Sequence, residues 1–166
     1  MVARNRRRYP GEQRTPRAVY YGWKKDEIEK LLDSLRKRSK GGIPIVVEGR
    51  RDREALGKLG VEGTVLCFKA IGESRLGFLD KLDGFRDIIL LTDFDREGSE
   101  LRLWLYQELT RRGIRADDLA WRRIRSLART EVRSVEELPS FVHSLEAKSR
   151  GERPGKAHPV RLSSKS

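Results

Sequence analysis

The chain has 166 residues, with 37 Lys and Arg, 25 Asp and Glu and a formal net charge of +12, a length that fits one domain. Its single cysteine, Cys67, excludes a disulfide framework and a multi-cysteine zinc site. No apolar run reaches the ~18 residues of a membrane span, and the arginine-rich start lacks the apolar stretch of a signal peptide. We therefore expect a cytoplasmic protein with no membrane partner.

The first predicted elements alternate between helix and strand. Residues 24–39 have apolar residues at helical spacing and predict an amphipathic helix, which Gly41 would stop. A short β-rich apolar run over residues 43–47 predicts a buried strand that ends at Glu48. A helix over residues 51–59 is expected to follow.

The alternation continues with a strand over residues 64–68, a helix over 75–82, a strand over 87–92 and a helix over 99–112. Residues 114–130 are ambiguous, with strand character around residues 121–124, and a last helix is expected over 135–147. Strands that alternate with helices form βαβ units. The sequence therefore predicts an α/β fold with a mostly parallel sheet of about four strands, flanked by helices.

Positive charge is concentrated at the two ends of the chain. Residues 1–25 carry a net charge of +7 and residues 148–166 carry +5, so the charges of residues 26–147 balance. Lys and Arg release counterions from phosphates, so basic arms favour a nucleic-acid partner, foremost RNA, a ribosome or another ribonucleoprotein. A solubilising tail, or an arm folded onto the protein's own acidic surface, is the alternative. The predicted organisation is a basic arm over 1–23, a helix and linker over 24–42, an α/β domain with its C-terminal helix over 43–147 and a basic tail over 148–166.

Aromatic residues interleave with the basic residues of the first arm. They are Tyr9, Tyr20, Tyr21 and Trp23. This pattern serves the stacking of nucleic-acid bases next to phosphate contacts. It also fits a simpler role, in which the rings anchor the arm to the domain.

Acidic residues follow two of the predicted strands. Glu48 comes directly after the first strand, and Asp93 and Asp95 follow the third. Parallel α/β sheets bind ligands at the carboxyl ends of their strands, so we expect these side chains to gather at one edge. Crowded carboxylates repel unless a cation offsets their charge, and hard oxygen ligands suit Mg²⁺ or Mn²⁺. The alternative is that Asp93, Asp95 and Glu97 only favour the start of a helix.

Two segments resemble the Toprim (topoisomerase–primase) domain family. The segment IPIVVEGRRDREAL is similar to the primase form, in which an Asp (here Asp52) follows the glycine of Glu-Gly by three residues. The segment IILLTDFDREGSE is similar to the Thr-Asp-x-Asp-Arg-Glu-Gly of type IA topoisomerases. The likeness covers roughly residues 43–125, and the gap between the motifs fits one βα unit. The resemblance implies a Rossmann-like Toprim domain that acts on nucleic acid with magnesium.

The resemblance also implies roles for individual residues. Glu48 matches the family's general acid or base, and Asp93 and Asp95 match its magnesium-binding aspartates. Glu97 matches an acid of the topoisomerase motif and is expected to help hold the metal. Arg96, in the same loop, is a candidate to stabilise the charge of a phosphodiester transition state, or else to pair with a neighbouring glutamate.

Basic residues outside these motifs are candidates for phosphate contacts. Two of them follow the second strand, at the sheet edge expected to hold the acids, and three lie in residues 111–133, which carry a local net charge of +5. Surface salt bridges are the alternative for this segment. The candidates are Lys69, Arg75, Arg122, Arg123 and Arg125.

Chain length and cysteine content narrow the kinds of Toprim protein that this sequence resembles. The chain cannot supply the large tyrosine-bearing domains of a type IA topoisomerase, and one cysteine excludes the zinc-binding domain of a bacterial primase. What remains resembles the small stand-alone Toprim proteins, namely the archaeal primase-like group and the bacterial ribonuclease that matures five-S ribosomal RNA. We expect a magnesium-dependent nucleic-acid-processing protein, foremost an RNA phosphodiesterase of the rRNA-maturation kind. The alternatives are a non-catalytic RNA- or ribosome-binding module and primase-like nucleotidyl transfer.

Overall fold

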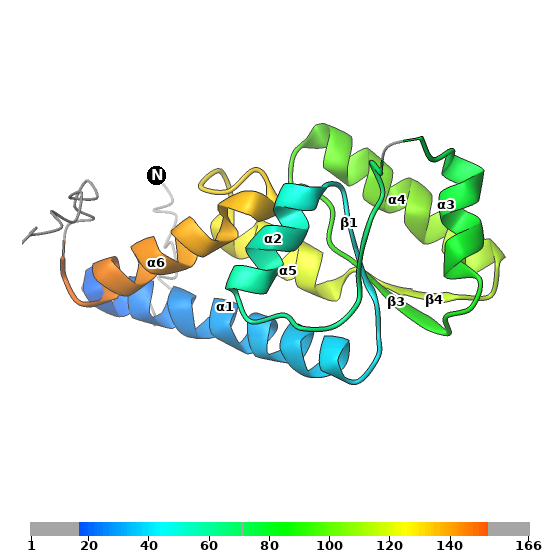
Figure 1. Cartoon of the computed structure of the whole chain (residues 1–166). Helices are drawn as coiled ribbons and strands as arrows, with labels where there is room; N and C mark the ends of the chain where they lie inside the picture. Colours follow the sequence, from blue (N-terminus) through cyan, green and yellow to red (C-terminus); the bar gives the residue numbers. More distant parts are fainter. Residues whose placement is uncertain (1–16, 71, 153–166) are drawn as a thin grey trace, which may run out of the picture.

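The computed structural model describes residues 17–70 and 72–152 (Figure 1). The elements in chain order are α1 (Arg17–Lys40), β1 (Ile45–Val47), α2 (Arg50–Lys58), β2 (Val65–Cys67), α3 (Arg75–Leu82), β3 (Asp87–Leu90), α4 (Arg96–Arg111), β4 (Arg115–Asp117), α5 (Leu119–Ala128), the 3₁₀ helix η1 (Val135–Glu137) and α6 (Leu138–Ser149). In this part of the chain, no helix has the length and apolar character needed to cross a membrane.

The four strands form one parallel sheet in the order β2-β1-β3-β4. The predicted α/β fold with a parallel sheet of four strands is therefore confirmed. Because the strands are parallel, the loops that follow them emerge at one edge. The register places Val47 opposite Cys67, and the Lys69 N–H donates to the carbonyl oxygen of Glu48 at 2.8 Å. This pairing brings the loops after β1 and β2 side by side.

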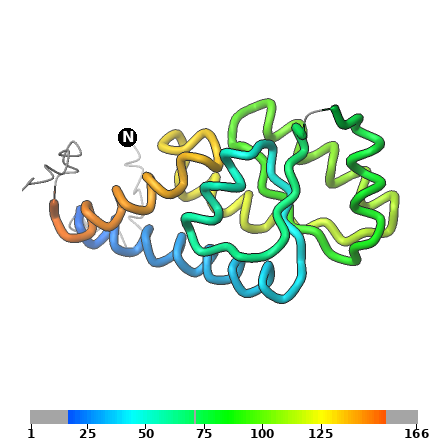
Figure 2. Tube along the Cα trace, viewed as in Figure 1, coloured from blue at the N-terminus to red at the C-terminus, as the bar shows by residue number. Residues whose placement is uncertain are grey.

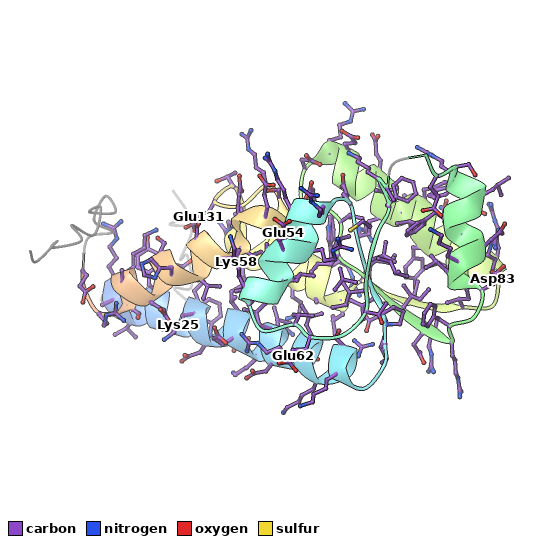
Figure 3. All side chains as sticks on the ribbon, in the orientation of Figure 1. Lys25, Glu54, Lys58, Glu62, Asp83 and Glu131 are labelled. Carbon is purple, nitrogen blue, oxygen red and sulfur yellow. The ribbon has the colours of Figure 1, made fainter. Side chains whose placement is uncertain are left out.

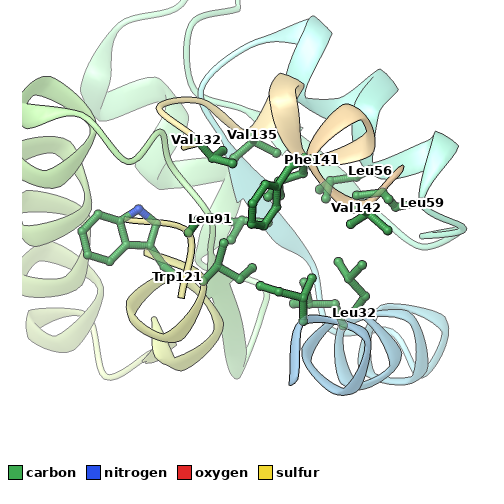
Figure 4. Packing of buried hydrophobic residues seen from close by; sticks show 14 of the residues in the cluster. Leu32, Leu56, Leu59, Leu91, Trp121, Val132, Val135, Phe141 and Val142 are labelled. Atoms are coloured by element: carbon green, nitrogen blue, oxygen red, sulfur yellow. The ribbon is translucent and has the colours of Figure 1, made fainter. Parts of the chain in front are cut away.

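Helices cover both faces of the sheet. On one face, α1, α2, α5 and α6 pack against β1 and β3, and Figure 4 shows Leu32, Leu56, Trp121 and Phe141 in this core. On the other face, α3 and α4 pack against Val46 and the alternate residues of β3. Burial on both faces explains why the strands read as continuous apolar runs in the sequence.

Helix α1 begins seven residues before its predicted start, so residues 17–23 of the predicted arm are helical. Ile28, Leu32 and Leu35 of α1 are fully buried in the same core as the sheet. Figure 2 shows α1 and α6 running side by side, and they pack along much of their length. Helix α1 is therefore an integral part of the domain. Tyr9 and most of both predicted arms lie outside the described residues.

The strand predicted around residues 121–124 is wrong, because this segment lies in helix α5. Trp and Ile favour strands by propensity. Trp121, Ile124 and Ala128, however, follow one another at helical spacing, and all three are buried in the core. The fourth strand lies just before this helix, in β4.

Candidate functional site

A pocket of about 440 Å³ opens at the carboxyl edge of the sheet. The loops that follow β1 and β3 both reach it, as the two sequence motifs predict. Its other walls come from the start of α2, the loop after β2 and the segment before α6. The lining residues are Glu48, Gly49, Arg50, Arg51, Asp52, Lys69, Asp93, Ser134 and Glu136.

Glu48 lies at the centre of the contacts in this pocket. Glu48 is only 4% exposed, and its Oε1 accepts a hydrogen bond from the backbone N–H of Asp93 at 3.1 Å. The ammonium of Lys69 lies 3.0 Å from Oε2 of Glu48 and 3.2 Å from Oε1 of Glu97. The hydrogen bond to Glu48 raises the pKa of Lys69. The Glu48 carboxylate is thus fixed by groups from the two loops on either side of its own, which follow β2 and β3.

Asp93 is held by three parts of the chain. Its Oδ1 accepts the backbone N–H of Val135 at 2.9 Å, and its carbonyl oxygen accepts the indole N–H of Trp121 at 3.2 Å. Helix α4 approaches the same carbonyl so closely that a Cβ on Gly98 would lie 2.1 Å from the oxygen. Only glycine fits at this position, which gives a structural reason for the Gly of the second motif.

The carboxylates of the pocket repel one another. Burial raises the pKa of Asp93 from 3.8 to about 7, and the nearby charges of Asp52, Glu48 and Asp95 act in the same direction. The hydrogen bond from Val135 opposes this rise. A cation close to Asp93 would relieve the repulsion.

Asp52 is a pocket residue that sequence analysis did not select as a site residue. It is 5% exposed, its Oδ2 accepts the N–H of Gly49 at 3.0 Å and its Oδ1 accepts the N–H of Glu136 at 3.2 Å. Burial raises its pKa. The sequence did contain an indication of this role, because Asp52 stands three residues after Gly49, a spacing at which an acid caps the start of a helix. The lining residue Ser134 had no local signal, because it reaches the pocket from a distant part of the chain.

The remaining residues of the second motif lie outside the pocket lining. Asp95 is the N-cap of α4 and accepts the N–H of Gly98 at 2.7 Å, so the helix-start alternative describes part of its role. The Arg96 side chain is 93% exposed and lies 3.1 Å from Glu100. The Glu97 side chain is also exposed and connects to the pocket through its ion pair with Lys69.

The donor set of the pocket suits magnesium in its chemistry. Glu48, Asp52 and Asp93 offer hard carboxylate oxygens at one cavity. Within residues 17–70 and 72–152, no group of three His, Cys, Asp or Glu side chains is arranged around a single point as a metal cage would be. Magnesium does not need such a cage, because it keeps several waters and combines one or two carboxylates with substrate phosphates.

Of the five predicted phosphate contacts, Lys69 alone lines this pocket. The guanidinium groups of the other four have partners elsewhere. Arg75 lies over the Trp104 ring at 4.9 Å, Arg125 lies over Trp121 at 5.2 Å, Arg122 pairs with Asp118 at 2.9 Å and Arg123 pairs with Glu27 at 3.2 Å. Arg50 and Arg51, which were not predicted, line the pocket instead.

Comparison with known proteins agrees with this geometry. Residues 43–121 match the Toprim domain. The chain is 40% identical over 105 residues to a UPF0292 protein of Thermoplasma volcanium, covering 63% of this chain and 86% of the relative. It is 37% identical over 126 residues to a UPF0292 protein of Methanocaldococcus jannaschii, covering 72% and 96%. A solved structure from Aquifex aeolicus shares the fold with a TM-score of 0.57 and 24% identity, covering 66% of this chain and 95% of that one. The chain therefore carries a Toprim domain and belongs to the family of UPF0292 proteins.

Proposed function

We propose that this protein is a magnesium-dependent enzyme that hydrolyses phosphodiester bonds in RNA. Toprim domains are generally associated with magnesium-dependent processing of nucleic acid. The observation that carries the proposal is the hydrogen bond between Glu48 and Asp93, which joins the two motif loops inside one pocket. The preference for RNA rests on the basic segments at both ends of the chain.

In this proposal, Asp93 and Asp95 hold the metal, with Glu97 in support. A magnesium ion bound there would polarise the phosphodiester. Both aspartates belong to the short turn between β3 and α4, and Gly98 allows that turn to pack tightly. Magnesium should bind this turn weakly without nucleic acid, because substrate phosphates complete the coordination.

Glu48 is the proposed general base or acid. It is buried, and the N–H of Asp93 and the ammonium of Lys69 hold its two oxygens in place. A positioned carboxylate of this kind takes the proton of an attacking water or assists the leaving oxygen. Fixed placement matters because proton transfer requires a close and well-directed contact.

Cationic side chains around the pocket are suited to phosphate groups. Arg50, Arg51 and Lys69 line the pocket, and in this proposal they contact the phosphates of the nucleic-acid backbone. Arg96 pairs with Glu100 through an exposed contact between adjacent helical turns, which is worth only about 0.3–0.5 kcal/mol. A phosphate can displace such a weak pair, so Arg96 is free to stabilise charge in the transition state.

The first experiment identifies the nucleic acids that copurify with the protein and incubates them with and without Mg²⁺. Shortened products that require magnesium support hydrolysis. Extended products in the presence of nucleotides would instead indicate primase-like transfer, and retention without chemical change would indicate a binding module.

The metal site is tested by titrating magnesium into a variant that combines Asp93→Asn with Asp95→Asn. Binding should be lost while the fold is kept, because both substitutions preserve size and hydrogen bonding. Asp87→Asn is the matched control, since Asp87 lies at the opposite end of β3 and pairs with Arg115 at 2.6 Å. An unchanged titration in the double variant would rule out the proposed metal ligands.

A further inference from the structure

The start of α1 exposes a cluster of apolar side chains. Val19 is 54% exposed, Tyr20 46% and Trp23 52%. The Tyr20 and Trp23 rings lie next to each other, with centroids 6.1 Å apart and planes inclined by 36°. Tyr21, by contrast, is half-buried and packs against the core. Of the two roles that the sequence allows for these aromatics, Tyr21 takes the anchoring role, and Tyr20 and Trp23 are available for contact with a partner.

Both ends of the described chain lie at this end of the molecule. Helices α1 and α6 run in opposite directions, and they are joined there by Lys25 and Glu146 at 3.8 Å and by Lys148 over the Tyr21 ring at 4.9 Å. Figure 1 shows the start of α1 next to the end of α6, and Figure 3 labels Lys25 on this part of α1.

The sequence beyond these two ends is strongly basic. Residues 1–16 and 153–166 together contain nine basic residues and one acidic residue. In the sequence, the first of these segments directly precedes Arg17 of α1, and the second begins shortly after the end of α6. An exposed aromatic pair thus lies on a helix whose preceding sequence is strongly basic, as is the sequence that follows α6. This is the chemistry of single-stranded nucleic-acid binding, in which bases stack on rings while cations contact the phosphates.

We propose that Tyr20 and Trp23 form a stacking site for the unpaired bases of a single-stranded RNA. This inference rests on the proposed function, because it gives the RNA substrate a single-stranded region that is bound away from the acidic pocket. Base faces are apolar and flat, and they belong to a polyanion. A partner of this kind suits both the exposed rings and the basic composition of the two terminal segments.

The test titrates a single-stranded oligouridylate into the full-length protein in the presence of a chelator, so that no cleavage contributes. Trp23 is exposed, whereas Trp121 is 1% exposed and Trp104 is half-buried. Stacking should therefore quench tryptophan fluorescence, and Trp23→Leu, which keeps an apolar side chain, should remove most of that quenching. Tyr20→Ala and Trp23→Leu should each weaken binding by about fivefold or more. A duplex of the same length should bind without the quenching.

Salt dependence separates stacking from charge. The slope of log affinity against log salt should stay unchanged in the aromatic variants, because stacking releases no counterions. Removal of residues 1–16 and 153–166, which leaves α1 whole, should flatten the slope by ~0.7 for each phosphate that the protein no longer neutralises. The matched control is Tyr106→Ala, which removes an exposed aromatic ring from α4 and should leave both affinity and slope unchanged.

Unchanged oligouridylate affinity in both aromatic variants would overturn the proposal. The proposal would also be overturned if the aromatic variants differed from the wild type in oligomeric state, measured by light scattering, but not in oligouridylate affinity. The cluster would then be a contact between copies of the chain. Failure of the stacking site can be distinguished from failure of the proposed hydrolytic function. A protein that cleaves RNA but binds oligouridylate without Tyr20 and Trp23 refutes the stacking site alone, and one that binds through them but never cleaves refutes the enzyme alone.

Discussion

Val135 donates its backbone N–H to Oδ1 of Asp93 at 2.9 Å, although it lies outside the Toprim-matched residues 43–121. The next residue, Glu136, donates in the same way to Asp52 at 3.2 Å. Two acidic residues of the pocket are therefore held by the segment that leads into α6. The geometry of the site depends on this added layer of the domain as well as on the sheet.

The repulsion between Asp93 and the neighbouring carboxylates should lower the thermal stability of the protein by a measurable amount. The raised pKa means that the folded state resists ionisation of this carboxyl, so ionised Asp93 destabilises the fold. The penalty is absent below the ordinary value of 3.8, grows as the pH rises towards about 7 and is complete above that value. Asp93→Asn keeps the acceptor for Val135 and removes the charge. In a chelator at pH 8, we expect its melting temperature to exceed that of the wild type by roughly 2 °C or more.

Magnesium and low pH provide the controls for this measurement. Added Mg²⁺ should raise the melting temperature of the wild type at pH 8, because the ion binds the folded state, and should leave the Asn variant unchanged. Below the ordinary value of 3.8 the two proteins should melt alike. A variant that is less stable than the wild type at pH 8 would contradict the repulsion at this position.

Lys69 should compete with magnesium for the pocket. Its ammonium lies within 3.2 Å of both Glu48 and Glu97 and offsets part of their charge. Lys69→Met keeps most of the side-chain volume and removes that charge, so magnesium affinity should rise several-fold while RNA affinity falls. Isothermal titration with Mg²⁺ measures the first effect. The control is Lys81→Met, which removes an exposed lysine of α3 that pairs with Glu73. Equal magnesium affinities of the Lys69→Met and Lys81→Met variants would argue against competition.

Gly98 should tolerate no side chain. A Cβ at this position would meet the carbonyl oxygen of Asp93 at 2.1 Å, and backbone atoms cannot yield as a flexible side chain can. Gly98→Ala should therefore displace the Asp93 turn, destabilise the fold and weaken magnesium binding. Gly57→Ala in α2 is the control, since a Cβ there meets nothing within 4 Å, and the change should be neutral or slightly stabilising. Equal melting curves for the two variants would contradict the close approach.

Helix α1 should be required for folding of the domain. Leu32 is completely buried between α1 and the sheet, so Leu32→Ala should lower the free energy of unfolding by about 2–5 kcal/mol. Denaturant titration measures this decrease. Ser34→Ala changes an exposed residue two positions away and should have little effect. A Leu32→Ala protein as stable as the wild type would show that the domain folds without α1.

The sequence was sufficient to predict the sheet and the meeting of the two motif loops. Apolar runs such as Ile88–Leu91 mark strands that are buried on both faces, and parallel pairing then brings Glu48 and Asp93 to one edge. The alternation of strands with helices predicts parallel strands, and the adjacency of β1 and β3 in the sheet then brings the two loops together.

Other features depend on contacts between distant residues and leave little trace in the sequence. The helical conformation of α5 is decided by the burial of Trp121 against Phe94, which outweighs its strand propensity. The contribution of Ser134 to the pocket depends on how the chain returns from α5 to α6. The early start of α1 depends on its packing against α6.

The most direct test of the proposed enzyme compares the wild type with Glu48→Gln on copurified RNA in Mg²⁺. Gln keeps the shape of the side chain and removes the group that exchanges a proton, so turnover should fall about 10²–10⁴-fold while RNA affinity stays nearly constant. Glu62→Gln, at an exposed residue labelled in Figure 3, should cleave like the wild type. Full cleavage activity in Glu48→Gln, or no magnesium-dependent cleavage by the wild type, would contradict the proposed enzyme.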